Sequence, residues 1–82
     1  MSPKEYNGHH CWTCWNVSLW IANDENLYHL AMDCLKATPP GTKGRFYRAA
    51  LRFRRLVAAS RTPDGANYSR IAVARALEGL ES

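Results

Sequence analysis

The sequence predicts an all-α protein that forms a single small domain of about four short helices. Its 82 residues, 46% of them apolar, provide enough material for one small core but not for two domains. In four segments, apolar residues recur every three to four positions, which is the spacing of one helix face. No stretch alternates apolar and polar residues as a half-buried strand would, so strands are not expected.

The single domain, residues 1–82, divides into four parts along the chain. Residues 1–11 form a polar N-terminal arm, and residues 12–36 form an aromatic helical half. Residues 37–44 are a joint rich in Pro and Gly, which cannot continue a helix. Residues 45–82 form a basic helical half.

The first predicted helix covers residues 12–22, which contain neither Gly nor Pro. One of its faces consists of Trp12, Trp15, Leu19 and Ala22. Val17 and Ile21 fall on the other side, so the helix is apolar nearly all round and is expected to be central and buried. Asn16 should then be hydrogen-bonded, because an unpaired buried amide costs about 1–3 kcal/mol.

A second helix is predicted to run to about Lys36, with Asn23 or Asp24 as its N-cap. Five residues at helical spacing form its inner face: Leu27, Leu30, Ala31, Cys34 and Leu35. The residues expected to point outward are Asn26, His29, Asp33 and Lys36.

Two further helices are predicted after the joint. The first covers residues 45–60, with an apolar face formed by Phe46, Ala49, Ala50, Phe53, Leu56 and Val57. Residues 61–65 then form a turn. The last helix is expected from about Tyr68 to Leu80, capped by Asn67 or Ser69, and should bury Ile71, Ala74 and Leu77.

A stripe of arginines on the third predicted helix is the strongest functional feature. No acidic residue lies between Lys43 and Arg61, and cations recur at helical spacing along the segment. A solvated helix face is the alternative interpretation, but the absence of acids favours an acidic partner, which arginine binds well. The predicted partner-binding residues are Lys43, Arg45, Tyr47, Arg48, Arg52 and Arg55. Tyr47 is their expected aromatic anchor, with Trp12 as an alternative.

Two blocks of the sequence resemble a known family. The first comprises Tyr6-Asn7-Gly8, the run from Trp15 to Ile21, Asn23-Asp24-Glu25 and Leu27-Tyr28, and the second runs from Thr62 to Gly65. Both are similar to blocks in a family of small phage- and plasmid-encoded proteins. Because that family has no settled activity, the resemblance implies an origin on a mobile element rather than a chemistry.

Metal binding and catalysis receive weaker support. The cluster His9, His10, Cys11 and Cys14 has the spacing of half a zinc site, which Cys34 or His29 could complete. A second Cys-x-x-Cys is missing, so we predict packed thiols and exposed imidazoles, with no metal and no cofactor. No catalytic motif is present and no third group would orient a His beside a Cys, so we predict that the protein is not an enzyme.

The sequence therefore predicts a non-enzymatic accessory protein that binds and inhibits or redirects a host complex, for example as an anti-CRISPR-like inhibitor. Its expected partner is an acidic host protein or a ribonucleoprotein. A helical DNA- or RNA-binding regulator that contacts phosphates through the same arginines is the alternative. We expect a monomer or a homodimer in the host cytoplasm and no membrane association, since neither a secretory signal nor a membrane-spanning stretch is recognisable. Leu56, Val57 or Leu80 would provide contacts for a dimer.

Overall fold

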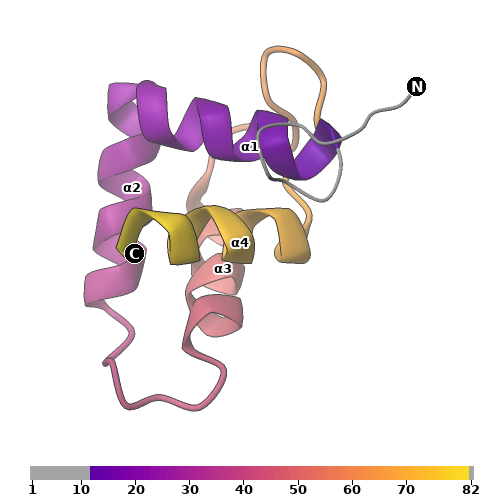
Figure 1. Cartoon of the computed structure of the whole chain (residues 1–82). Coiled ribbons are helices and arrows are strands. Elements are labelled where there is room, and N and C mark those ends of the chain that lie inside the picture. The colour runs from indigo at the N-terminus through magenta and orange to yellow at the C-terminus, as the bar shows by residue number, and fades with distance from the viewer. Residues whose placement is uncertain (1–11, 82) are drawn as a thin grey trace.

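The computed structural model describes residues 12–81, which form four α-helices (Figure 1). These are α1 (Trp12–Asn23), α2 (Glu25–Lys36), α3 (Arg45–Leu56) and α4 (Arg70–Glu81). Within these residues the extended pairing is limited to one isolated bridge between Arg61 and Asn67, and the predicted all-α class is confirmed. None of the four helices has both the length and the apolar character needed to cross a membrane.

The last helix, α4, occupies the centre of the structure. It packs against α1 on one side and α3 on the other, and it also touches α2 (Figure 1). Its buried residues are mostly small: Ala72, Val73, Ala74, Ala76 and Leu77. Small side chains allow neighbouring helices to approach closely, because the distance between helix axes depends on the residues at the contact. Larger side chains from the surrounding helices, led by Phe53, Ile21 and Leu35, fill the core.

One of the two apolar faces of α1 enters the core. Its buried residues are Cys14, Asn16, Val17 and Ile21. Trp12 and Leu19, from the opposite face, are 38% and 39% exposed. The helix contacts α2 and α4 but not α3, so the prediction that it is central is wrong. Both of its faces are apolar, and the compact Val17 and Ile21 fit more closely against the small residues of α4 than tryptophans would.

The second helix follows the prediction. Asp24 is the N-cap of α2, and its Oδ1 accepts a hydrogen bond from the Leu27 amide at 3.0 Å. Asn23 is not the cap, since its side-chain amide donates to the Leu19 carbonyl at 2.8 Å. The inner residues are buried or half-buried and the outer ones are exposed, as the periodicity predicted.

The third helix is shorter than predicted. It ends at Leu56 rather than Ser60, and Val57 has an extended backbone with ψ of 137°. Leu56 was expected to face the core but is 65% exposed. Beyond the helix end, Tyr68 in the connection to α4 is buried against the ring of Phe53, at 5.6 Å between centroids.

The fourth helix starts two residues later than predicted, at Arg70. Ser69, one of the two predicted capping residues, precedes this helix. Its hydroxyl accepts a hydrogen bond from the Ala72 amide at 3.2 Å. Ala74 and Leu77 are buried as predicted, but Ile71 is 53% exposed. The alanines beside Ile71 allow a closer contact with α1 and α3, so they occupy the core side.

Candidate functional site

The third helix presents two opposite sides to its surroundings. Its inner side packs against α2 and α4 through Ala49, Ala50 and Phe53, each of which is 0% exposed. The exposed residues on the outer side are Tyr47, Arg48, Leu51, Arg52, Arg54 and Arg55. We refer to the cations Lys43, Arg48, Arg52, Arg54 and Arg55 as the basic face.

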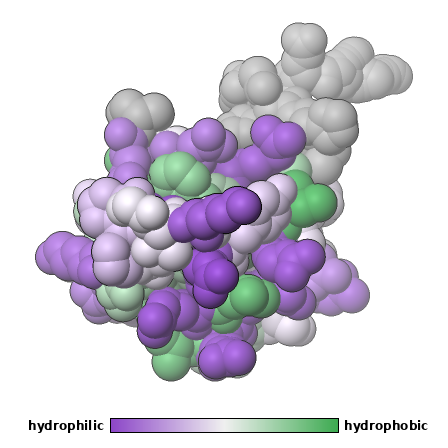
Figure 2. Space-filling view, turned by 90° about the horizontal axis from the view of Figure 1, so that it is seen from below, coloured by the Kyte–Doolittle hydropathy of each residue, from purple (hydrophilic) through white to green (hydrophobic). Residues whose placement is uncertain are grey.

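The lower side of the molecule as drawn in Figure 1, toward which the joint between α2 and α3 extends, is mostly hydrophilic. In the view of Figure 2, hydrophobic side chains lie singly among hydrophilic ones on this side. Among the described residues, the ion pairs join His29 to Glu25 and Arg45 to Glu81. No cation of the basic face therefore has a carboxylate of the described residues within 4.0 Å.

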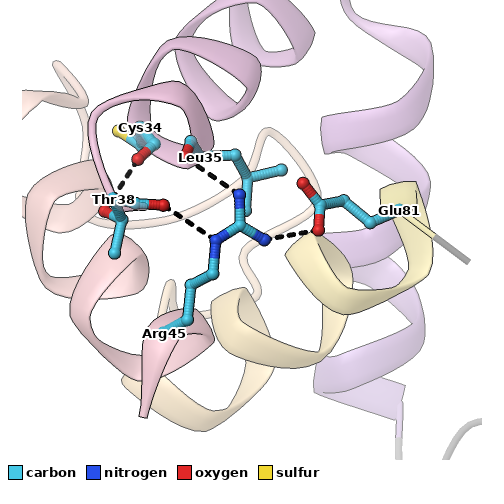
Figure 3. A network of polar contacts seen from close by, with 5 residues as sticks. All are labelled: Cys34, Leu35, Thr38, Arg45 and Glu81. Atoms are coloured by element: carbon cyan, nitrogen blue, oxygen red, sulfur yellow. Dashed lines mark hydrogen bonds and ion pairs between the residues drawn. The ribbon is translucent and has the colours of Figure 1, made fainter. Parts of the chain in front are cut away.

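Arg45 begins α3 but does not share this exposure. Its guanidinium group lies among the ends of three helices (Figure 3). Its Nε donates to the Thr38 carbonyl at 2.8 Å, and its Nη2 donates to the Leu35 carbonyl at 3.1 Å. Its Nη1 forms an ion pair with Glu81 at the end of α4. The predicted exposed stripe therefore loses Arg45, whose side chain is only 12% exposed.

The contacts of Arg45 stabilise the C-terminal end of α2. The last carbonyl groups of a helix have no partner within that helix. Arg45 donates to one of these carbonyls, that of Leu35, and also to the carbonyl of Thr38 (Figure 3). The Thr38 hydroxyl in turn donates to the Cys34 carbonyl at 2.9 Å. The hydrogen bond from Arg45 also lowers the pKa of the Glu81 carboxyl below its ordinary value. Arg45 thus connects α2, α3 and α4 rather than serving an external partner.

The remaining predicted residues are placed at the surface. Lys43 and Arg48 are exposed, and the Nε of Arg48 donates to the Lys43 carbonyl at 3.1 Å, which orients the guanidinium group. Tyr47 is 50% exposed, and the guanidinium carbon of Arg70 lies 5.8 Å from the centre of its ring. Arg52 is exposed on the same helix.

Two shallow grooves flank the ridge formed by α3. The first runs between the helix and the joint, and is lined by Thr38, Pro39, Thr42, Arg48, Arg52 and Arg55 among others. The second runs between the helix and the connection to α4, and is lined by Arg54, Arg55, Ser60, Asn67 and Tyr68 among others. Leu51 and Arg55 line both grooves and therefore form the crest between them.

Two members of this surface were missed from the sequence. Arg54 lies off the predicted stripe, although its position in the run Arg52-Phe53-Arg54-Arg55 was a visible signal. Leu51 is 40% exposed at the crest. Nothing in the sequence distinguished this leucine from a core residue, because apolar periodicity does not record which residues a neighbouring helix covers.

The proposed half zinc site falls mostly outside the described residues, since His9, His10 and Cys11 precede residue 12. Cys14 and Cys34 are buried at 4% and 2% exposure. Burial raises the pKa of the Cys34 thiol, which disfavours the thiolate that a metal would bind. His29 lies exposed on the outer side of α2. Within residues 12–81, no group of three or more His, Cys, Asp or Glu side chains is arranged to hold a metal.

Asn16 is the buried polar residue of α1, at 1% exposure. Its Nδ2 donates to Asp64 Oδ2 at 2.8 Å, and its Oδ1 accepts from the Thr62 hydroxyl at 2.6 Å. The indole Nε1 of Trp20 donates to the same Asp64 oxygen at 2.9 Å. The expected pairing of Asn16 is thus confirmed. The hydrogen bonds from Asn16 and then from Trp20 lower the pKa of Asp64 below its ordinary value.

The loop that carries Asp64 is held by its own backbone. The Gly65 amide donates to the Thr62 carbonyl at 2.8 Å, and the Thr62 amide donates to the Ala66 carbonyl at 2.8 Å. The Thr62 hydroxyl also accepts from the Ala66 amide at 3.0 Å. Gly65 has a φ of 95°, a conformation that favours glycine. Pro63 follows Thr62 in the turn, where its restricted φ is suitable.

The two sequence blocks that carry the family resemblance therefore meet in space. Asn16 and Trp20 come from the first block, and Thr62 and Asp64 come from the second, 44 to 48 residues further along the chain. Their hydrogen bonds fasten the connection between α3 and α4 to α1. These motif residues support the fold, and the basic face lies on a different helix.

Comparisons with known proteins identify a family for this chain. No curated protein and no solved structure matches the chain. A family of unknown function (DUF7249) matches residues 2–80, a range that includes both sequence blocks and the whole basic face. The chain therefore belongs to the DUF7249 family.

Proposed function

We propose that this protein is a non-enzymatic binding protein whose basic face docks on an acidic surface of a host macromolecular complex and inhibits or redirects that complex. One observation carries the proposal: the five cations of the basic face are exposed, and no carboxylate of the described residues lies within ion-pair distance of them. Cations that gather without nearby counter-charges create a positive local potential, which attracts an acidic partner. Arg45 is left out of the binding set because its donors are used within the fold.

The residues between these cations favour a protein over a nucleic acid. Leu51 is 40% exposed on the crest that it shares with Arg55, and Tyr47 is 50% exposed. Energetically important residues of protein interfaces are often Tyr and Arg around an apolar centre. Nucleic-acid interfaces are more polar and more positively charged. An acidic protein surface with apolar side chains at its centre would match the outer side of α3.

An anti-CRISPR-like inhibitor is the narrower form of this proposal. The first sequence block resembles a family of phage- and plasmid-encoded proteins. An origin on a mobile element would place the protein in a host cell, beside the complexes of that cell. A small inhibitor of this kind needs a docking surface and no catalytic group. The host partner would be an acidic protein or a ribonucleoprotein whose nucleic-acid path the basic face could cover.

Two variants with equal charge changes test the binding surface. Arg48→Ala/Arg55→Ala removes two cations from the basic face, while Lys36→Ala/Arg75→Ala removes two exposed cations from α2 and α4. In quantitative pull-downs from a bacterial host lysate, we expect a specific partner to be retained by the wild type and by the second variant. The first variant should bind at least about tenfold more weakly, since one hydrogen bond to a charged group contributes about 1.5–3 kcal/mol. Equal recovery by all three proteins would contradict the proposal.

A salt titration decides between a protein and a nucleic acid. The purified protein would be mixed with labelled duplex DNA and with RNA at about 50 mM and 200 mM salt. Binding through several phosphates falls by orders of magnitude over this range, because each contact releases counterions. We expect no specific binding to either nucleic acid. Strong salt-dependent binding that Arg48→Ala/Arg55→Ala abolishes would replace the proposed function with that of a nucleic-acid-binding regulator.

A further inference from the structure

A second surface of the molecule is apolar rather than basic. It is a groove between the start of α2 and the segment that follows α3. Apolar residues dominate its lining, among them Leu27, Leu30, Leu56, Val57, Ala59 and Pro63. The groove does not include the crest residues Leu51 and Arg55, and it shares no lining residue with the groove beside the joint. It adjoins the groove beside Arg54, with which it shares Val57, Ala59 and Tyr68.

All four residues of the segment 56–59 are apolar, yet three of them are exposed and Val57 is only half-buried. The sequence contains two other apolar runs of this length, 19–22 and 71–74, and both contribute buried residues to the core. None of residues 56–59 is buried. Leu56 is 65% exposed, the largest value among the exposed large apolar residues of the described chain. A continuous apolar surface of this kind marks an interaction site, because leaving it in water is unfavourable.

The charges at the two edges of the groove have opposite signs. Asp24 lies on the α2 edge, followed by Glu25, whose side chain is 87% exposed. Arg61 lies on the opposite edge, where its Nη1 donates to the Gly65 carbonyl at 3.2 Å. Suppose that a second copy is rotated by 180° about an axis along the groove. The acidic edge of each copy then faces the basic edge of the other, and the two apolar linings meet.

We propose that a second copy of this chain covers the groove and that the protein forms a two-fold symmetric dimer through Leu56. The two edges of the surface are complementary to each other in charge, so a second copy can cover it without a different partner. Dimerisation would also bring two basic faces into one particle, which raises the effective concentration of the second face once the first has bound. The dimer itself does not depend on the proposed function of the basic face.

Sedimentation equilibrium of the full chain over a range from about 5 to 500 μM tests the proposal. We expect a reversible monomer–dimer equilibrium in the wild type. Leu56→Asp should weaken dimerisation at least about tenfold, because each leucine contact appears twice in a symmetric interface. Ile71→Asp is the matched control, since Ile71 is also apolar and 53% exposed but lies on α4, away from the groove. Circular dichroism confirms that both variants fold.

A charge exchange tests the orientation of the two copies. Arg61→Glu alone should weaken the dimer, and the double variant Arg61→Glu/Glu25→Lys should restore it. A wild type that stays monomeric up to about 500 μM would overturn the proposal. So would a dimer that Leu56→Asp leaves unchanged, or one in which the double variant is weaker than Arg61→Glu. Measurement in the absence of any lysate separates this result from a failure of the basic face to find its partner.

Discussion

The hydrogen-bonded group Asn16, Trp20, Thr62 and Asp64 and the basic face of α3 use polar side chains in opposite ways. In the first, donors and acceptors satisfy one another within the chain, and Asn16 is 1% exposed. In the second, five cations point to solvent and have no carboxylate of the described residues within ion-pair distance. The comparison teaches that polar residues that hold the fold and exposed cations without counter-charges can lie on different helices of one small domain.

The same contrast occurs within α3 itself. Arg45 and Arg48 are three residues apart on one helix, yet the side chain of Arg45 is 12% exposed while Arg48 is an exposed residue. Arg45 finds two carbonyls and a carboxylate at the ends of α2 and α4. Within residues 12–81, the Arg48 side chain donates a hydrogen bond to the Lys43 carbonyl beside it and to no other group. Position along a helix therefore does not decide whether an arginine supports the fold or remains available to a partner.

The largest expected effect comes from Asn16→Ala. The substitution removes the acceptor of the buried Thr62 hydroxyl group and one of the two side-chain donors to the Asp64 carboxylate. We expect the free energy of unfolding to fall by about 2–3 kcal/mol, measured by urea denaturation. Asn26→Ala, at an exposed position of α2, should change it by less than about 0.5 kcal/mol. Similar values for the two variants would show that the motif does not hold the fold.

A second pair of variants compares two arginines of α3. Arg45→Met removes the donors to the Leu35 and Thr38 carbonyls, and we expect a loss of about 1–3 kcal/mol in the free energy of unfolding. Arg48→Met removes one exposed contact and should change stability by less than about 0.5 kcal/mol. Arg48→Met should weaken partner binding more than Arg45→Met does, when the affinity is calculated for the folded fraction of each variant. A partner that is lost with Arg45→Met and retained with Arg48→Met would mean that the basic face is wrongly assigned.

The smallest expected effect is a change in the dependence of stability on pH. The pKa of Asp64 is lower in the folded protein than in the unfolded chain, because Asn16 and Trp20 donate hydrogen bonds to the carboxylate. Its ionised form stabilises the fold fully above the unfolded pKa of about 4, and this contribution is lost as the pH falls through the folded pKa. The pKa of Glu81 is shifted in the same direction by Arg45.

Thermal unfolding of the wild type and of Asp64→Asn from pH 7 down to about pH 2 measures this contribution. The melting temperature of the wild type should fall with pH through the acid range. Asp64→Asn should start lower at neutral pH and fall less steeply, because its side chain does not titrate. Asp33→Asn, at an exposed position of α2, is the control. If the wild type and Asp64→Asn have parallel curves, the Asp64 hydrogen bonds contribute nothing to acid stability.

Much of the fold could be predicted from local patterns. The boundaries of α2 and its Asp24 cap follow from residues within one or two turns, and the all-α class follows from four stretches of helical periodicity. The pairing of Asn16 followed from the cost of burying an amide, although its partners were not predictable. The end of α3 at Leu56 was missed because the helical spacing of apolar residues continues to Val57. The packing of Tyr68 against Phe53, from twelve residues beyond Leu56, is a contact that local spacing does not reveal.

Most residues of the candidate site could be predicted from the sequence, but the way in which they lie together on the surface could not. Lys43, Arg48, Arg52, Arg55 and Tyr47 are exposed, as a partner-binding surface requires. Whether they bind a partner stays a prediction. Leu51 was not recognised, since a periodic pattern shows that a residue is apolar but not whether another helix covers it.

The sequence by itself determined the elements of this protein: four helices, a break rich in Pro and Gly, a basic second half and a buried amide that needed partners. These features depend on local spacing and on residue chemistry, which act within a few positions of the chain. Only the tertiary structure decided which face of α1 is buried and where the Arg45 guanidinium group points. It also decided that Leu56 remains in solvent. Each of these outcomes depends on contacts between residues from different helices, whose distances are set by the packing of α4 against α1 and α3.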